Sequence, residues 1–175
     1  MEAENERTGE LAIDLANTLR PAGDGSTLDL LADEDRLARW LRGAGGPDAI
    51  APSELATLRT HVRALLTAAV ARRPLPPAAV TAVNRAGAAA PGFAQLEAGE
   101  LVVRYHASPA EAFLADIATS AIGLVGGPDR DRLRRCQAPG CGRWFLASRP
   151  RQTWCSPDCG NRARLARFRQ RRRVA

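Results

Sequence analysis

The amino-acid sequence predicts a mainly α-helical fold with a small β-hairpin, followed by a short cysteine-framed segment near the C-terminal end. Apolar residues make up 45% of the chain but aromatic residues only 5%. The core must therefore be built from alanine, leucine and valine, which favours helices over a β-sandwich. Apolar residues also recur at helical spacing between breaks that are rich in proline and glycine. All four cysteines lie within residues 136–159.

The first two helices are expected within residues 11–43. Leu11, Leu15 and Leu19 recur every four residues, which favours a helix that the segment 21–26 then breaks. Asp33 is a good N-cap for the second helix, because its carboxylate accepts hydrogen bonds from the first-turn N–H groups.

The third and fourth helices are expected on either side of a proline-rich break. Ser53 and Glu54 open the longer one, and leucines follow at helical spacing. The prolines of residues 74–77 stop it. Pro77 fits the first position of a fourth helix that runs through Ala88, because its missing N–H is not needed there.

A β-hairpin and a fifth helix are expected next. Residues 101–105 are β-prone, and residues 97–100 before them fit a hairpin turn. Residues 108–111, Ser-Pro-Ala-Glu, match a capping box with proline at the first helical position. The fifth helix should run to about Val125, and residues 126–128 should form a linker.

The four cysteines form two short-spaced pairs. Cys136 and Cys141 are separated by four residues, thirteen residues follow, and Cys155 and Cys159 are separated by three. Two such pairs supply the four thiolates of a tetrahedral zinc site. We therefore predict that all four bind a structural Zn²⁺ ion with no open coordination position.

The charge of the chain is strongly divided. All 25 basic residues are arginine. Residues 1–129 hold 11 arginines against 17 acidic residues, a charge of −6, whereas residues 130–175 hold 14 against 2, a charge of +12. Codon bias can explain the choice of arginine but not its placement. The basic end should attract a polyanion, of which nucleic acid is the first candidate.

The arginines of the C-terminal end fall on a predicted helix. Ser156 as cap and Pro157 as first residue start this helix, which should run to about Arg172. Its arginines point to nearly every side of the helix, which suits a helix that lies in a groove with phosphates on both flanks. The alternative is that this segment is a frayed, solvated tail. The candidate nucleic-acid-binding residues are Asn161, Arg162, Arg164, Arg167, Arg169, Arg171, Arg172 and Arg173.

Other polar and aromatic residues of this end have two interpretations each. Asn161 would either contact a base or hydrogen-bond a thiolate or a loop carbonyl. The aromatic residues Trp144, Phe145 and Trp154 would either form a small core, with the segments around Phe145 and Thr153 paired as a hairpin, or stack on bases. Arginines 134, 135, 143 and 162 are expected to offset the charge of the thiolates.

In the N-terminal part, Asp14, Asn17 and Thr18 form the one notable polar set. They either hydrogen-bond at a helix end or line a ligand pocket. His61 and His106 have no obvious partner for catalysis, so no enzyme is expected. The first ten residues are acidic and polar, unlike a signal peptide. The most apolar stretch, residues 112–125, is expected to be too short to span a bilayer. We therefore expect a soluble, cytoplasmic protein without a membrane partner, whose reduced cysteines bind metal.

The chain resembles a known family. Cys159-Gly160-Asn161-Arg162, the upstream cysteine pair and the arginine-rich helix resemble the CGNR zinc finger of bacterial regulators. The N-terminal part resembles the ABATE domain, a proposed stress-induced transcription regulator. The quoted features there are the segment 11–19, the proline break before the helix ending at Val83-Asn84, and the hairpin followed by an apolar helix.

The resemblance implies two domains and a regulatory function. An α-rich, ABATE-like domain over residues 1–127 would sense a small-molecule effector or form a homodimer. A small, treble-clef-like zinc finger over residues 128–175 would bind nucleic acid, DNA in preference to RNA. The alternatives are an RNA-binding protein, a zinc-stabilised adaptor for an acidic protein and, last, an enzyme with a small-molecule site in the N-terminal domain.

Overall fold

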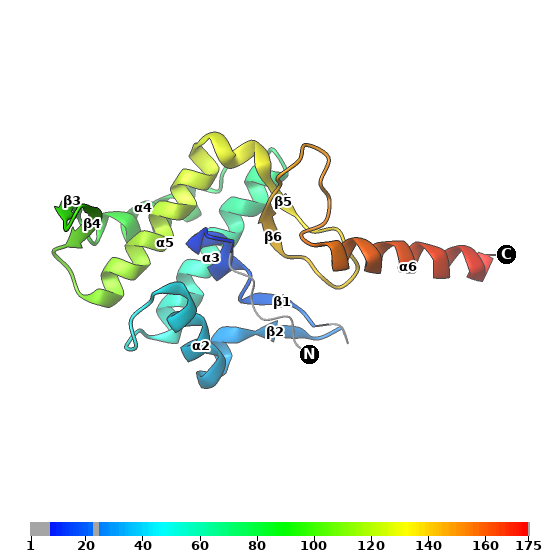
Figure 1. Ribbon diagram of the computed structural model, residues 1–175, viewed down its shortest axis with the longest axis horizontal. Helices are drawn as coiled ribbons and strands as arrows, with labels where there is room; N and C mark the ends of the chain where they lie inside the picture. Colours follow the sequence, from blue (N-terminus) through cyan, green and yellow to red (C-terminus); the bar gives the residue numbers. More distant parts are fainter. Residues whose placement is uncertain (1–7, 23–24, 175) are drawn as a thin grey trace.

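The computed structural model describes residues 8–22 and 25–174, with the side chains of Arg173 and Val174 outside the description. Helices dominate it (Figure 1), which confirms the predicted fold class. The α-helices are α1 (Leu11–Ala16), α2 (Glu34–Ala44), α3 (Pro52–Val70), α4 (Pro77–Ala88), α5 (Pro109–Gly126) and α6 (Pro157–Val174). Two 3₁₀ helices, η1 (Leu30–Ala32) and η2 (Pro128–Arg132), connect elements.

The core lies where α5 packs against α1, α3 and α4. Ile13 and Leu15 of α1, Leu55 and Leu66 of α3, and Ile117 of α5 have no exposed surface. Apolar side chains of α2 extend the core beside α5. There the aromatic rings of Trp40 (α2) and Phe113 (α5) pack edge to face. Apolar burial of this kind is the main stabilising contribution of the N-terminal part.

The predicted start signals of α2, α4 and α5 are confirmed. Helix α3, expected to open at Ser53 and Glu54, begins instead at Pro52, and its N-cap Ala51 makes no side-chain hydrogen bond. The Asp33 side chain accepts from the backbone N–H of Arg36 at 2.8 Å. Ser108 and Glu111 complete the capping box of α5. Pro77 is the first residue of α4, which ends at Ala88. These signals are local, so their outcome depends little on tertiary packing.

Three two-stranded antiparallel hairpins accompany the helices in the described part of the chain, whereas the sequence predicted two. The predicted hairpin that forms is β3 (Gly92–Glu97) with β4 (Glu100–Tyr105), joined by a turn at residues 98–99. The other two are β1 (Leu19–Pro21) with β2 (Thr27–Asp29), and β5 (Leu133–Arg135) with β6 (Trp144–Leu146).

The predicted helix over Leu11–Leu19 is wrong at its end. The α1 helix stops at Ala16, and Leu19 opens β1 instead. The Thr18 hydroxyl donates to the carbonyl of Leu15 at 2.7 Å, a local bond that competes with the helical ladder. Of the segment expected as a break, Pro21 ends β1, and Ala22, Gly25 and Ser26 lie between β1 and β2, where Ala22 N–H donates to the Ser26 carbonyl at 2.8 Å.

The expected hairpin of the segments around Phe145 and Thr153 is also wrong. Phe145 pairs with Arg134 in the β5–β6 hairpin, and Thr153 contributes a single hydrogen bond from Gln137 N to its carbonyl. Two residues of this hairpin join the core of the helical part: Leu133 is 1% exposed and Trp144 is 2% exposed. The hairpin therefore connects the cysteine-framed segment to the helices.

An ion pair between the buried Arg59 and the partly exposed Asp29 connects the β1–β2 hairpin to α3. Arg59 of α3, 5% exposed, donates through Nη1 and Nη2 to the two carboxylate oxygens of Asp29, at 2.5 and 2.7 Å. The same Nη1 donates to the Thr18 hydroxyl. Hydrogen bonds from Arg59 hold the pKa of Asp29 below its usual value of 3.8.

Helix α5 differs from the expectation that its apolar stretch is too short for a bilayer. Among the described helices it alone is long and apolar enough, by length and composition, to cross a membrane. Its residues Ile117, Ala118 and Ala121 are completely buried against neighbouring helices. The central helix of a globular core meets the same criteria of length and composition.

Candidate zinc centre and nucleic-acid interface

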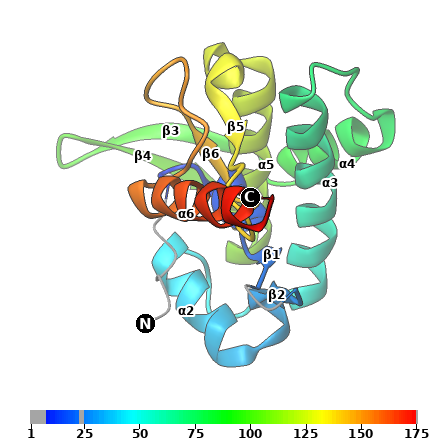
Figure 2. The same cartoon turned by 90° about the vertical axis from the view of Figure 1, so that its right-hand side faces the viewer.

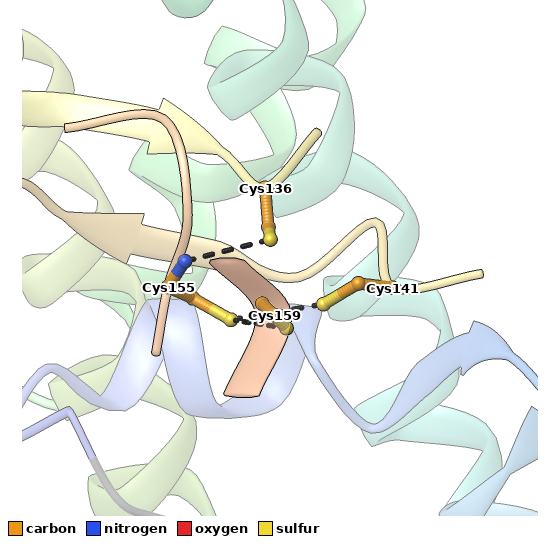
Figure 3. A group of neighbouring side chains, drawn as sticks. All are labelled: Cys136, Cys141, Cys155 and Cys159. Atoms are coloured by element: carbon orange, nitrogen blue, oxygen red, sulfur yellow. Dashed lines mark hydrogen bonds between the residues drawn. The ribbon is translucent and has the colours of Figure 1, made fainter. Parts of the chain in front are cut away.

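The four cysteine side chains converge on one point beneath the base of α6 (Figure 3). All their Sγ atoms lie within 4.8 Å of one another. The Sγ of Cys155 is 3.7 Å from that of Cys141 and 3.6 Å from that of Cys159. Sulfur atoms bound at about 2.3 Å around one tetrahedral Zn²⁺ are about 3.8 Å apart, so these distances fit zinc.

Each cysteine is held by a short local structure. Cys136 directly follows β5, and its N–H donates to the Arg143 carbonyl at 2.7 Å. Cys141 lies between two glycines with positive φ, Gly140 and Gly142, whose conformations few other residues adopt without strain. Cys159 lies in the first turn of α6, where its N–H donates to the capping Ser156 hydroxyl.

The thiols cannot all ionise together without a cation. A hydrogen bond to Cys141, together with burial, raises the pKa of Cys155, and burial raises the pKa of Cys136. The hydrogen bond from Cys155 lowers the pKa of Cys141 to about 4. Metal ligation therefore releases protons, as zinc–thiolate sites generally do. The burial of three of the four cysteines leaves little room for a further ligand, consistent with structural zinc.

Helix α6 projects away from the rest of the molecule in Figure 1, and in Figure 2 its C-terminal end lies toward the viewer. Its apolar residues Leu165 and Phe168 are 57% and 56% exposed, and Ala163 is its one buried side chain beyond the first turn among those described. The side chain of Arg173 lies outside the described residues. The predicted arginines whose side chains are described are all exposed: Arg162, Arg164, Arg167, Arg169, Arg171 and Arg172.

Asn161 is exposed on α6, and its Oδ1 accepts a hydrogen bond from Arg164. The structure thus places it among the arginines rather than against a thiolate. The neighbouring Gly160 is buried against Trp154: an added Cβ would lie 3.2 Å from Cδ1 of that ring. The close approach that Gly160 permits is therefore to an aromatic side chain.

Three of the four arginines expected to offset the thiolates make contacts with backbone carbonyls or an aromatic ring. Arg134 donates to the carbonyls of Asp131 and Leu133. The Arg135 guanidinium lies 5.5 Å from the centre of the Trp144 ring. Arg162 reaches the Pro139 carbonyl at 3.4 Å. The Nη2 of Arg143 is buried and has no hydrogen-bond partner among the described residues.

Residues 128–174, which hold the four cysteines and α6, are called the zinc module below. The polar set of the N-terminal part lies at the junction with this module. Asn17 donates through Nδ2 to the Trp144 carbonyl at 3.0 Å, and its Oδ1 accepts from the Trp144 N–H at 2.8 Å. Asp14 accepts from the N–H and the hydroxyl of Thr8. Thr18 is completely buried and bonded to Leu15 and Arg59. Side-chain bonding, one of the two predicted alternatives, is what these contacts describe.

Of this polar set, Asn17 also lines a cavity. The cavity measures about 230 Å³ and lies between the helical part and the zinc module, with Arg143, Phe145 and Gln152 among its walls. Asp14 and Thr18 are not part of its lining. This cavity is therefore not the expected pocket of the three residues together.

Sequence reasoning missed one basic segment. Residues 148–154 form a loop beside the base of α6 and carry Arg149 and Arg151, both exposed. Their presence in the basic C-terminal end was the available signal, but without the fold nothing placed them near α6.

The fold and the site define a zinc-binding protein with an α-rich N-terminal part and a four-cysteine finger that ends in a basic helix. Comparison with family models agrees. Residues 9–128 match the ABATE model, described as "Putative stress-induced transcription regulator", and residues 132–172 match the CGNR zinc finger. The chain therefore belongs to the ABATE family and carries a CGNR zinc finger. A search of curated proteins found no match.

Proposed function

We propose that this protein is a nucleic-acid-binding transcription regulator that binds its target through α6, with DNA preferred over RNA. The observation that carries the proposal is the display of arginines on all sides of a helix that leaves the body. A helix of this kind fits the major groove of DNA, where phosphates flank it on both sides. The family description supports a regulatory role.

In this proposal, zinc fixes the base of α6 and the arginines supply affinity. Cys159 is both a zinc ligand and a first-turn residue of α6, so the metal sets the direction in which the helix leaves the module. Phosphate contacts position the protein, and Asn161 or Arg164 near the base would contact base edges. The charge of +12 beyond residue 129 drives association, while the acidic body limits non-specific contacts.

The N-terminal part would act as the regulatory body. We propose that it responds to a small-molecule effector or forms a homodimer in the cytoplasm, without a membrane partner and without catalytic activity of its own. The hydrogen bonds between Asn17 and Trp144 support this assignment, because they join the body to the finger directly. A dimer would suit a target with two half-sites.

The proposal is tested by anisotropy titrations of the zinc-loaded chain with labelled duplex DNA and with a hairpin RNA, from low to moderate salt. We expect steep salt dependence, and each of Arg169→Ala and Arg171→Ala should reduce the salt slope by about one. Arg85→Ala, an exposed arginine of α4, is the matched control and should bind as the parent does. Binding that hardly changes with salt, or that Arg85→Ala weakens equally, contradicts the proposal.

Zinc removal provides a second arm of the same experiment. Chelation should abolish binding, because a segment with so few buried apolar residues needs metal ligation to hold its fold. Re-addition of Zn²⁺ should restore binding. Tighter binding of the RNA hairpin than of the duplex would favour the RNA-binding alternative. Binding of an acidic polypeptide without binding of either nucleic acid would favour the adaptor alternative.

A further inference from the structure

A groove of about 590 Å³ lies at the base of α6, between the 148–154 loop and the first turns of the helix. We call it the Trp154 groove. Its volume is within the range of about 300–1,000 Å³ that is usual for small-ligand sites. The groove residues that matter for its chemistry are Arg149, Arg151, Gln152, Trp154, Pro157 and Arg164.

The loop that forms one wall of the groove is held in place by Gln152. Its Oε1 accepts from the N–H and the hydroxyl of Ser148, at 2.9 and 3.0 Å. Its Nε2 donates to the Trp154 carbonyl at 3.0 Å. The Gln152 N–H also donates to the Arg149 carbonyl, closing a turn. The two arginines of the loop are therefore displayed from a pre-organised segment, which lowers the entropic cost of binding.

The floor of the groove is apolar and aromatic. Trp154 is half-buried, and its ring rests on Gly160. The Arg167 guanidinium lies 5.9 Å from the ring centre. Pro157 continues the floor toward α6. An indole face beside arginines is the combination that single-stranded nucleic-acid sites use, because every base has a face that can stack.

The charge of the groove decides what occupies it. Arg149, Arg151 and Arg164 line it, and no acidic residue is among the described lining residues. Three guanidinium groups around an aromatic floor complement a nucleotide, whose phosphates are anionic and whose base is flat and largely apolar on its faces. A fully paired duplex keeps its bases inside the stack and cannot place one on this floor.

We propose that the Trp154 groove binds one unstacked nucleotide of a single-stranded or locally unpaired segment. The base lies against Trp154, and the flanking phosphates lie at the three groove arginines. This inference rests on the proposed nucleic-acid binding by α6. It adds that the nucleic acid is unpaired where it meets the base of that helix.

Tryptophan fluorescence of the zinc-loaded full chain tests the proposal. Trp40 and Trp144 are 5% and 2% exposed, so acrylamide quenching reports mainly on Trp154. A saturating twelve-nucleotide oligothymidylate should protect Trp154 from acrylamide, and a paired duplex of the same length should not. The matching oligouridylate shows whether the sugar matters, since the groove chemistry is shared by DNA and RNA.

Affinity of two matched double variants completes the test. Arg149→Ala/Arg151→Ala should weaken oligothymidylate binding roughly five- to tenfold more than duplex binding. Arg171→Ala/Arg172→Ala, at the far end of α6, should weaken both equally. Circular dichroism and zinc content should match the parent, because the loop arginines contribute no side-chain bond to the zinc module among the described contacts.

The outcomes separate the two proposals. Oligothymidylate that binds without protecting Trp154 overturns the groove proposal and leaves binding by α6 intact. If each double variant loses as much affinity for oligothymidylate as for duplex, the groove proposal is likewise overturned and binding by α6 is left intact. Failure of every nucleic acid to bind overturns the proposed function together with the groove.

Discussion

At the scale of single residues, Asn17 carries the closest contact between the two parts of the chain. Its amide engages both backbone groups of Trp144, as a neighbouring strand would. Asn17 is 6% exposed and Trp144 is 2% exposed. The two backbone groups of Trp144 therefore lose a buried hydrogen-bond partner when the amide is removed, and they bear a desolvation cost.

We expect Asn17→Ala to lower the free energy of unfolding by about 3 kcal/mol, because it leaves two buried backbone groups of Trp144 unsatisfied. Urea unfolding of the zinc-loaded chain measures this. The control is Asn84→Ala, an exposed asparagine on α4, which should change stability by less than about 0.5 kcal/mol. Equal effects of the two substitutions would show that the Asn17 contacts do not stabilise the junction.

Asp29→Asn tests the ion pair between Asp29 and the buried Arg59. We expect a loss of about 3 kcal/mol at pH 7, since the substitution leaves the Arg59 charge buried without its partner. The folded-state pKa of Asp29 lies below its usual 3.8. Its contribution is therefore complete above about pH 5 and is lost as pH falls through the folded-state value.

The difference in unfolding free energy between the parent and Asp29→Asn should consequently shrink as the pH is lowered from about 5 to about 3. Loss of zinc at low pH affects both proteins alike and cancels in that difference. Asp48→Asn, in an exposed loop, controls for the change in net charge. A difference that stays constant across this range would contradict the assigned role of the pair.

At the scale of elements, the sequence predicts most helices and misses the short strands. Capping residues such as Ser108 and Asp33 act within four residues, so their signal is complete in the sequence. The β1–β2 and β5–β6 hairpins have three-residue strands. Such strands are too short to show alternation, and packing against the core determines them.

The candidate site was predictable to a similar extent. The zinc ligands follow from spacing, because a tight turn brings each pair together. The Trp154 groove does not, since Arg149 and Arg164 lie far apart in the sequence and meet through the path of the loop. The expected aromatic core was divided: Trp144 packs into the helical core, whereas Phe145 packs with the cysteines. A two-residue alternation in β6 sends the neighbours to opposite faces.

Gly127, between α5 and η2, offers a test at the element scale. A Cβ at this position would lie 2.3 Å from the carbonyl oxygen of Gly123, so the backbone must shift. We expect Gly127→Ala to cost about 2 kcal/mol or more. The neighbouring Gly126 has open space where a methyl group would lie, and Gly126→Ala should stabilise α5 by up to about 1 kcal/mol.

Thermal unfolding monitored by circular dichroism distinguishes the two glycines. Opposite signs for the adjacent substitutions support a steric stop at residue 127. Destabilisation by both would instead indicate that the whole segment 126–127 must remain flexible.

At the scale of the whole molecule, the zinc module packs against the helical core and is not connected to it by a linker alone. Leu133 and Trp144 lie in the core of the N-terminal part. A fragment of residues 1–127, the expected first domain, lacks both. We expect it to be less stable than the full chain by about 4 kcal/mol, given the contribution of two large buried side chains.

Unfolding of the fragment and of the full chain in urea measures this, with the chelated full chain as a control for the contribution of zinc. The chelated chain retains Leu133 and Trp144, so it should fall between the other two. A fragment as stable as the full chain would show that residues 1–127 form an independent unit.

Because α6 is attached only at its base, a small rotation there displaces its tip by a much larger distance. The helix has 18 residues, which makes it about 27 Å long. A rotation of about 10° at its base therefore moves its tip by about 5 Å, more than the spacing of roughly 3.4 Å between successive base pairs. A sub-ångström change at the bond between Asn17 and Trp144 is magnified along this arm. In the proposed complex with nucleic acid, the N-terminal part would in this way change which phosphates the distal arginines reach.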